Sequence, residues 1–175
     1  MRIPDHLPQC RQPAIIGVVC TEEAHIYSAR DGFISEEVAI RRSVGVDDAW
    51  TRDIESRGAL PVIIPARGVT AEQVLQERFL EEIGYRVEML SHRKRVERIV
   101  LFAAVSMKDI TVRVLPPSVR SRIELVVEGA YCLSLPDELL QRYRLEQARR
   151  RRIEHALRPA WQHKGEPLEA AQREP

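Results

Sequence analysis

The sequence predicts an α/β domain built on a mixed sheet of five strands, followed by a long C-terminal helix. Three short apolar or alternating stretches open the chain, a pattern typical of an antiparallel meander. Beyond them, strand-like apolar runs alternate with segments of helical periodicity, and this order is typical of α/β domains. A chain of 175 residues is long enough for one such domain with its own hydrophobic core.

The meander is expected over residues 14–20, 24–29 and 33–41. Its first stretch, AIIGVVC, is a continuous apolar run that suits a buried strand. The second and third stretches alternate in polarity, as half-buried strands do. Between these two, Asp31-Gly32 supplies the residue pair that tight hairpin turns prefer, because glycine accepts positive φ. We therefore expect three strands paired antiparallel in chain order.

Helices and strands then alternate. A helix is expected over residues 70–90, with a buried stripe at three- and four-residue spacing formed by Leu75, Phe79, Ile83, Val87 and Leu90. The remaining elements are strands and helices expected over residues 98–105, 107–115, 123–127 and 136–157. Ser106 with Asp109 is typical of a helix start, and Pro116-Pro117 ends that helix.

The segment from residue 43 to 68 shows no periodicity, apart from a short strand-like run over 60–64. A connection of this length inside a compact domain is usually a functional or disordered loop. We expect a single α/β domain over residues 14–158 whose last helix projects from the body. Residues 1–13 would form an N-terminal extension and residues 159–175 a flexible tail.

Composition limits the class of protein. The formal net charge is only +1, so only the distribution of charge could indicate a nucleic-acid partner. Cys10, Cys20 and Cys132 form no C-x-x-C pair and leave one thiol over in any pairing, which favours a reduced, cytoplasmic protein. The longest apolar run has seven residues, far fewer than a membrane helix needs, and no signal-peptide core is visible. We expect a soluble intracellular protein with no membrane partner.

Four local features carry a resemblance to a known family. They are AIIGVVCTEEAHIYSARDGFI, the residues Gln73 and Arg78-Phe79 at a helix start, VERIVLFAAVSMKDI, and VRSRIELVVEGAYCLSLPDELLQRY. From residue 15 to about 143 the chain resembles the middle domain of archaeal and eukaryotic translation release factors and their bacterial relatives. Those relatives include proteins required for attachment to host cells. The resemblance implies a ribonuclease H-like fold and a partner such as tRNA or the ribosome.

In active members of that family, the loop before the helix carries Gly-Gly-Gln, whose Gln positions water against the peptidyl-tRNA ester. Here Pro65-Ala66-Arg67-Gly68 resembles the approach to that motif, but four residues separate Gly68 from Gln73, and no second glycine precedes Gln73. The resemblance therefore implies a non-hydrolytic module that binds RNA or a ribosome-like partner. Its alternative is a peptidyl-tRNA hydrolase of ribosome rescue, in which Gln73 orients water while Arg67, Gly68 and Arg78 contact phosphate.

Gln73 also has a structural interpretation. Thr70 and Gln73 stand at the spacing of a capping box, in which each side chain bonds the backbone N–H of the other. Each of these contacts satisfies an amide that the first turn of a helix leaves unpaired. We favour capping over catalysis for Gln73.

No metal or cofactor site is predicted. A metal-dependent nuclease of ribonuclease H type needs a carboxylate on the first strand to hold Mg²⁺, and residues 14–20 contain none. The five histidines are scattered, without the spacing of a zinc site. Cys20 and Cys132 lie in or near apolar stretches, where a small buried thiol is the usual state.

The C-terminal helix concentrates positive charge. Residues 141–158 contain seven arginines and two glutamates, a local net charge of +5. Arg149, Arg150, Arg151 and Arg152 are consecutive, so at about 100° per residue they surround the helix. Two interpretations stay open: a solvated helix end, where cations suit the helix dipole, or an arm that binds RNA phosphates through arginine forks.

Overall fold

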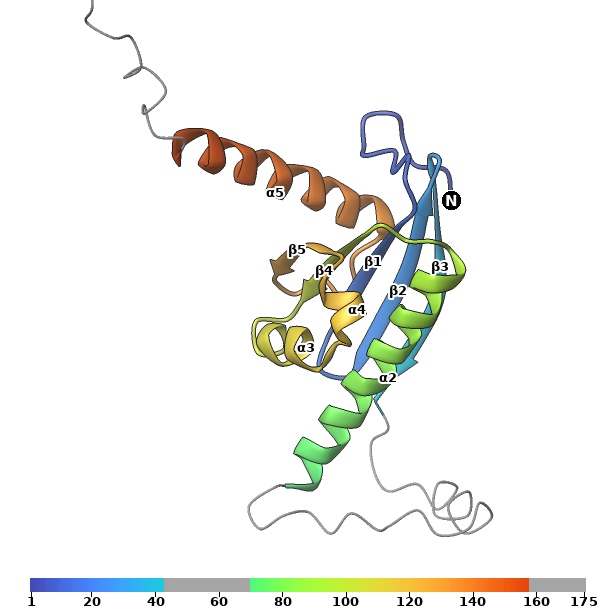
Figure 1. Ribbon diagram of the computed structural model, residues 1–175, viewed down its shortest axis with the longest axis vertical. Coiled ribbons are helices and arrows are strands. Elements are labelled where there is room, and N and C mark those ends of the chain that lie inside the picture. The colour runs from blue at the N-terminus through green and yellow to red at the C-terminus, as the bar shows by residue number, and fades with distance from the viewer. Residues whose placement is uncertain (43–69, 158–175) are drawn as a thin grey trace, which may run out of the picture.

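The protein, seen in a computed structural model, is described here over residues 1–42 and 70–157. These residues form one sheet of five strands, namely β1 (Ala14–Val19), β2 (Glu23–Arg30), β3 (Phe33–Arg41), β4 (Arg98–Ala103) and β5 (Ile123–Glu128). The helices of the same residues are α2 (Ala71–Arg93), α3 (Lys108–Val114), α4 (Pro117–Arg120) and α5 (Pro136–Leu157). Figure 1 shows their arrangement.

The sheet is mixed, with the strand order β3-β2-β1-β4-β5. Strands β1, β2 and β3 pair antiparallel in chain order, because their short connections allow only hairpins. Strand β4 runs parallel to β1, and β5 runs parallel to β4, since helices carry the chain back between them. The α/β class, the five-stranded mixed sheet and the opening meander are therefore confirmed.

The β2–β3 hairpin turns at the predicted pair. Asp31 has φ 50° and Gly32 has φ 78°, the positive values that two-residue hairpin loops need. The segment before β1 packs against this turn: the N–H of Gly32 donates to the carbonyl of Gln9 at 2.8 Å, and the N–H of Ile3 donates to the carbonyl of Gly32 at 2.7 Å. Ile3 is fully buried, so the first residues contribute to the core.

Two hydrophobic cores lie on opposite faces of the sheet. Helices α2, α3 and α4 cover one face, and α5 with the N-terminal segment covers the other (Figure 1). The first core contains four members of the predicted α2 stripe, namely Phe79, Ile83, Val87 and Leu90. The second includes Leu139, Leu140 and Tyr143 of α5. This burial fixes the first half of α5 on the sheet.

The start of α3 differs from the prediction. Met107 is its N-cap residue, and no side chain caps it, so the predicted pairing of Ser106 with Asp109 is wrong. Met107 is fully buried, and the hydroxyl of Thr111 donates to its carbonyl at 2.7 Å. The start of α3 is therefore set by the burial of Met107, which is a tertiary contact, and not by a capping side chain. The short helix α4, opened by Pro117, was also not predicted.

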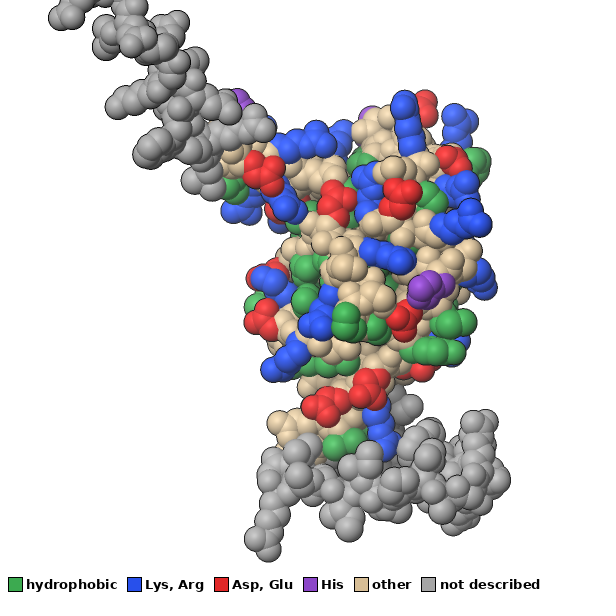
Figure 2. Space-filling view, in the orientation of Figure 1, with side chains coloured by type: hydrophobic (Ala, Val, Ile, Leu, Met, Phe, Trp, Pro, Cys, Tyr) green, Lys and Arg blue, Asp and Glu red, His purple; other side chains and the backbone are tan. Residues whose placement is uncertain are grey.

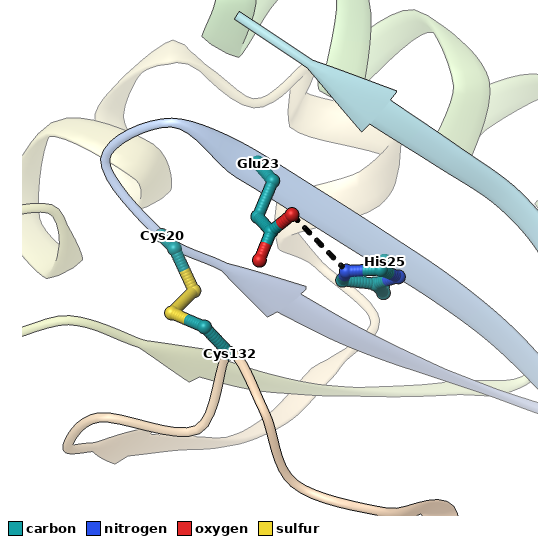
Figure 3. The surroundings of a disulfide bond; sticks show 4 residues. All are labelled: Cys20, Glu23, His25 and Cys132. Carbon is teal, nitrogen blue, oxygen red and sulfur yellow. Dashed lines mark ion pairs between the residues drawn. A yellow bond between two sulfur atoms is a disulfide. The ribbon is translucent and has the colours of Figure 1, made fainter.

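The cysteines differ from the prediction as well. Cys20, just after β1, and Cys132, between β5 and α5, form a disulfide with their Cα atoms 6.1 Å apart (Figure 3). The expectation of two buried free thiols is therefore wrong, because the fold brings together residues that lie 112 positions apart. Cys10 is the free cysteine of the described residues, and burial raises the pKa of its thiol.

Candidate nucleic-acid interface

The base of α5 is held on the sheet by a polar network as well as by apolar packing. The hydroxyl of Tyr143 donates to both carboxylate oxygens of Glu124 on β5, at 3.0 and 3.1 Å. Gln147, one turn further along α5, donates from Nε2 to the same carboxylate at 2.7 Å. Burial, and then the negative charge of Glu124, raises the pKa of Tyr143 to about 12. Tyr143 therefore stays neutral and keeps donating to Glu124 throughout the physiological pH range.

Arg150 takes part in this attachment. Its Nη1 donates to the backbone carbonyl of Glu124 at 2.8 Å, and its Nε donates to the carboxylate of Glu154 at 2.9 Å. Both contacts fix the guanidinium beside the sheet edge. Of the four consecutive arginines, Arg150 thus contacts the edge of the sheet through its Nη1, although its side chain stays 58% exposed.

Arg149, Arg151 and Arg152, the other three arginines of the cluster, are exposed as well. Arg149 lies 3.9 Å from the carboxylate of Glu146, a pair of little energetic weight because Arg149 is largely in water. Within residues 1–42 and 70–157, neither Arg151 nor Arg152 forms an ion pair. Figure 1 shows the second half of α5 extending away from the sheet, and Arg151 and Arg152, which belong to this half, are exposed. We call Arg149, Arg151 and Arg152 the arginine arm.

Gln73 lies at the opposite end of the molecule. The N–H of Thr70 donates to Oε1 of Gln73 at 2.8 Å, and the N–H of Gln73 donates to Oγ1 of Thr70 at 3.2 Å. The predicted capping box is therefore confirmed, and its geometry folds the Gln73 side chain back onto the start of α2. The role of Gln73 in catalysis stays a prediction.

The remaining predicted site residues do not gather at one place. Arg78 lies on an exposed position of α2, in the second turn after Gln73, whereas Arg67 and Gly68 lie outside the described residues. Figure 1 shows α2 beginning at the lower end of the molecule and α5 leaving from the upper end. The structure thus separates the Gln73 region from the arginine arm.

The described part of the chain offers neither a group of side chains for a metal ion nor a helix for a membrane span. No group of three or more His, Cys, Asp or Glu side chains there is placed to hold a metal ion. Beside the disulfide, Oε2 of Glu23 lies 3.9 Å from Nε2 of His25 (Figure 3). None of the helices over these residues combines the length and apolar character that a membrane span requires.

A partly buried charge cluster connects the β2–β3 hairpin to the end of α2, and the sequence did not predict it. Lys94, the C-cap of α2, donates from Nζ to Glu37 at 2.5 Å and to the hydroxyl of Ser28 at 3.0 Å. Ser28 and Ser35 also donate to the Glu37 carboxylate, at 2.6 and 2.9 Å. Burial alone would raise the pKa of Glu37, but these hydrogen bonds to its charged form outweigh burial and lower the pKa to about 2.

This cluster predicts a dependence of stability on acid. The ordinary pKa of glutamate is 4.5 and the folded value is about 2, so the stabilisation is complete above about pH 4.5. It should be lost as the pH falls from there towards 2. Because the site is partly solvated, we expect a loss of about 1 to 2 kcal/mol. Urea unfolding of wild type and Glu37→Gln at pH 6 and pH 2.5 measures it.

In that experiment the gap in unfolding free energy between wild type and Glu37→Gln should narrow at the lower pH. Glu81→Gln, which changes an exposed glutamate of α2, serves as the matched control. Its unfolding free energy should differ from that of wild type by the same small amount at pH 6 and at pH 2.5. A gap of equal size at pH 6 and pH 2.5 would contradict the assigned role of Glu37.

Among known proteins, this chain is similar to some solved structures but to no family model or curated protein. No family model matches it, and no curated protein matches it. Among solved structures, the archaeal translation termination factor aRF1 is 13% identical at a TM-score of 0.44, with 82% of this chain covering 41% of that one. Ribosome-bound archaeal Pelota is 14% identical at a TM-score of 0.49, and the match covers 81% of this chain and 36% of that one. An Aquifex aeolicus Ppx/GppA phosphatase is 11% identical at a TM-score of 0.38, and the match covers 67% of this chain and 36% of that one.

The chain thus spans less than half the length of each of these three proteins. All three TM-scores are below 0.5 and all three sequence identities are below 15%.

Proposed function

We propose that this chain is a non-hydrolytic module that binds RNA, free or within a ribosome-like particle, through the phosphates. The carrying observation is the arginine arm: exposed guanidinium groups on a helix whose base is held by buried apolar side chains and by Tyr143 and Arg150. The class of partner, tRNA or the ribosome, follows from the resemblance of the sequence to release-factor middle domains.

The arm has the chemistry that phosphate binding needs. Arginine presents a planar fork of donors that matches phosphate oxygens, and it stays charged at every physiological pH. Arg151 and Arg152 would give up no ion pair with the described residues on binding. The attached helix also limits the conformational entropy that ordering the arm would cost. Figure 2 shows Lys and Arg side chains along α5 as it leaves the body.

The alternative function, a peptidyl-tRNA hydrolase, would require Gln73 to leave its capping contacts. Losing a cap of this type costs about 1 kcal/mol, and the water-orienting side chain would then have to be held by other groups. A hydrolysis assay on peptidyl-tRNA separates the two functions. We expect no release of peptide by the wild type, and release that disappears in Gln73→Ala with stability intact would establish the enzyme.

The arginine arm is tested by the salt dependence of RNA binding. Each phosphate contact to a single strand contributes about 0.7 to the slope of log K against log salt, because bound cations are released. Changing Arg149, Arg151 and Arg152 together to glutamine should therefore lower the magnitude of the slope by about 2. The loss of affinity should be similar for different RNA sequences, because phosphate contacts carry no base information. Fluorescence anisotropy with labelled oligonucleotides at several KCl concentrations measures both.

The control variant removes the same charge elsewhere. Arg86, Arg113 and Arg120 are exposed residues of α2, α3 and α4, and their joint change to glutamine should leave the slope nearly unaltered. Glutamine keeps helix propensity close to that of arginine, so both triple variants should fold. Equal effects of the two triple variants would show that only net charge matters and would overturn the role of the arm.

A further inference from the structure

A second group of cations surrounds a cavity that neither the arm nor Gln73 uses. The cavity has a volume of about 610 Å³ and lies between the start of β1, the end of β2 and the chain that follows α2. Its charged lining residues are Arg30, Arg93, Lys94, Arg95 and Glu97. Four cations against one carboxylate leave a net charge of +3 on these residues. We call this site the basic cavity.

The backbone after α2 presents three of these cations in succession. Lys94 is the C-cap, and Arg95 then adopts φ 52°, a left-handed conformation. The N–H of Val96 donates to the carbonyl of Ser91 at 2.9 Å and closes the turn. Glycine is the usual residue at this left-handed position, because it has no Cβ. An arginine here is strained, and such strain is often retained where the side chain has a function.

The cations differ in how far they are already neutralised. Lys94 is committed to Glu37 at 2.5 Å, whereas Arg93 approaches the same carboxylate only at 3.4 Å with its side chain 68% exposed. Arg30 pairs with Asp31 in water, a contact of little weight. Arg95 forms no ion pair with any residue that the structure describes. Arg93 and Arg95 are therefore the cations available to a ligand.

The dipole of α2 explains only part of this cluster. Cations in the last turn of a helix are favoured by its partial negative charge, which accounts for Arg93. Arg30, however, belongs to strand β2, and Arg95 follows the helix with its backbone in an unfavourable region. Helix stability alone therefore gives no reason for either arginine to face the cavity.

We propose that the basic cavity binds a backbone phosphate of the same RNA strand that the arginine arm contacts. Arginine forks match phosphate oxygens, and the volume accommodates a phosphate with its sugar. No aromatic side chain is present among the described residues that line the cavity, so bases would not stack there. Figure 2 shows Lys and Arg side chains, with some Asp and Glu between them, over the upper end of the molecule from α5 to the end of α2. The inference rests on the proposed function.

The test removes the two available charges without weakening the fold. In Arg93→Gln/Arg95→Gly, glycine relieves the left-handed strain at position 95, so the melting temperature should stay the same or rise. Binding of a labelled oligouridylate should nevertheless weaken by about 10-fold or more near 0.1 M KCl, and the magnitude of the salt slope should fall by about 1.4. Arg86→Gln/Arg113→Gln, which removes the same charge outside the cavity, should change neither quantity appreciably.

The outcomes separate this inference from the proposed function. If RNA binding depends on the arm but Arg93→Gln/Arg95→Gly behaves like its control, the basic cavity is not a contact and the proposed function stands. If the cavity variant lowers the slope while the arm variant does not, the cavity contacts RNA without the arm, and both the proposed role of the arm and the inference of a strand shared by the two sites are overturned. Wild type that binds no RNA overturns both. Amide resonances of Lys94, Arg95 and Val96 should also shift on addition of the oligouridylate, and unchanged resonances would contradict the site.

Discussion

Removing the Cys20–Cys132 disulfide is expected to lower the free energy of unfolding by about 2 to 5 kcal/mol. The bond joins residues 112 positions apart, and closing so long a loop restricts the unfolded chain strongly. It also ties the loop before α5 to the end of β1, beside the core that holds α5 (Figure 3). Urea unfolding of wild type with and without reductant measures the effect with no change of sequence.

Two variants complete this measurement. Cys20→Ala/Cys132→Ala should match the reduced wild type and should not respond to reductant. Cys10→Ser changes the free cysteine and should keep the full response to reductant. If reductant leaves the unfolding curve of the wild type unaltered, the bond does not contribute to stability.

The redox state also bears on the proposed function. Thiol pools keep cysteines reduced in the cytoplasm of most cells, where tRNA and ribosomes are found. RNA binding should therefore be measured with the disulfide both formed and reduced. Because Leu139, Leu140 and Tyr143 hold α5 independently of the bond, we expect the arginine arm to bind in both states.

Phe102→Ala should cost about 3 to 5 kcal/mol of unfolding free energy. Phe102 is fully buried on β4, which is paired on both sides by β1 and β5, so the surrounding sheet cannot easily collapse into the space left behind. Its ring also meets that of Tyr131 edge to face, with centroids 5.0 Å apart, and such pairs add about 0.5 to 1.5 kcal/mol. Urea unfolding followed by circular dichroism measures the loss.

Phe102→Leu is the matched control, because leucine keeps most of the apolar volume. Its cost should be about 1.5 kcal/mol or less, apart from the lost aromatic contact with Tyr131. A cost below about 1 kcal/mol for Phe102→Ala would mean that the core beneath α5 repacks, and that the attachment of the helix is looser than the structure shows.

Much of the fold could be predicted from the sequence because it depends on neighbouring residues. Alternating and apolar runs predicted all five strands, and Asp31-Gly32 predicted the hairpin turn that the φ angles confirm. Thr70 and Gln73 predicted the start of α2, since a capping box needs only residues three positions apart. The periodic stripe likewise predicted which side of α2 is buried, because helical geometry is local.

The candidate sites depended on contacts that no local pattern contains. Residue type and spacing predicted an arginine cluster, but only the tertiary structure decided that Arg150, and not Arg151 or Arg152, donates a hydrogen bond to β5. The basic cavity lies between the end of β2 and the end of α2. Arg30 and Arg95 both line it because the strands of the hairpin pack beside that helix.

Sequence by itself thus determined the five strands of the sheet, the helices α2 and α5, and the order of charge along the last helix, but neither α4 nor the start of α3. Tertiary structure alone decided the partners of Cys20 and Glu37. The physical reason is that hairpins, helix capping and turns are chosen within a few residues, whereas the pairing of β1 with β4, the disulfide, the ion pairs of Glu37 and the cavity arise between segments far apart in the chain. These long-range contacts form only when helices cover both faces of the sheet, and that packing depends on residues throughout the core.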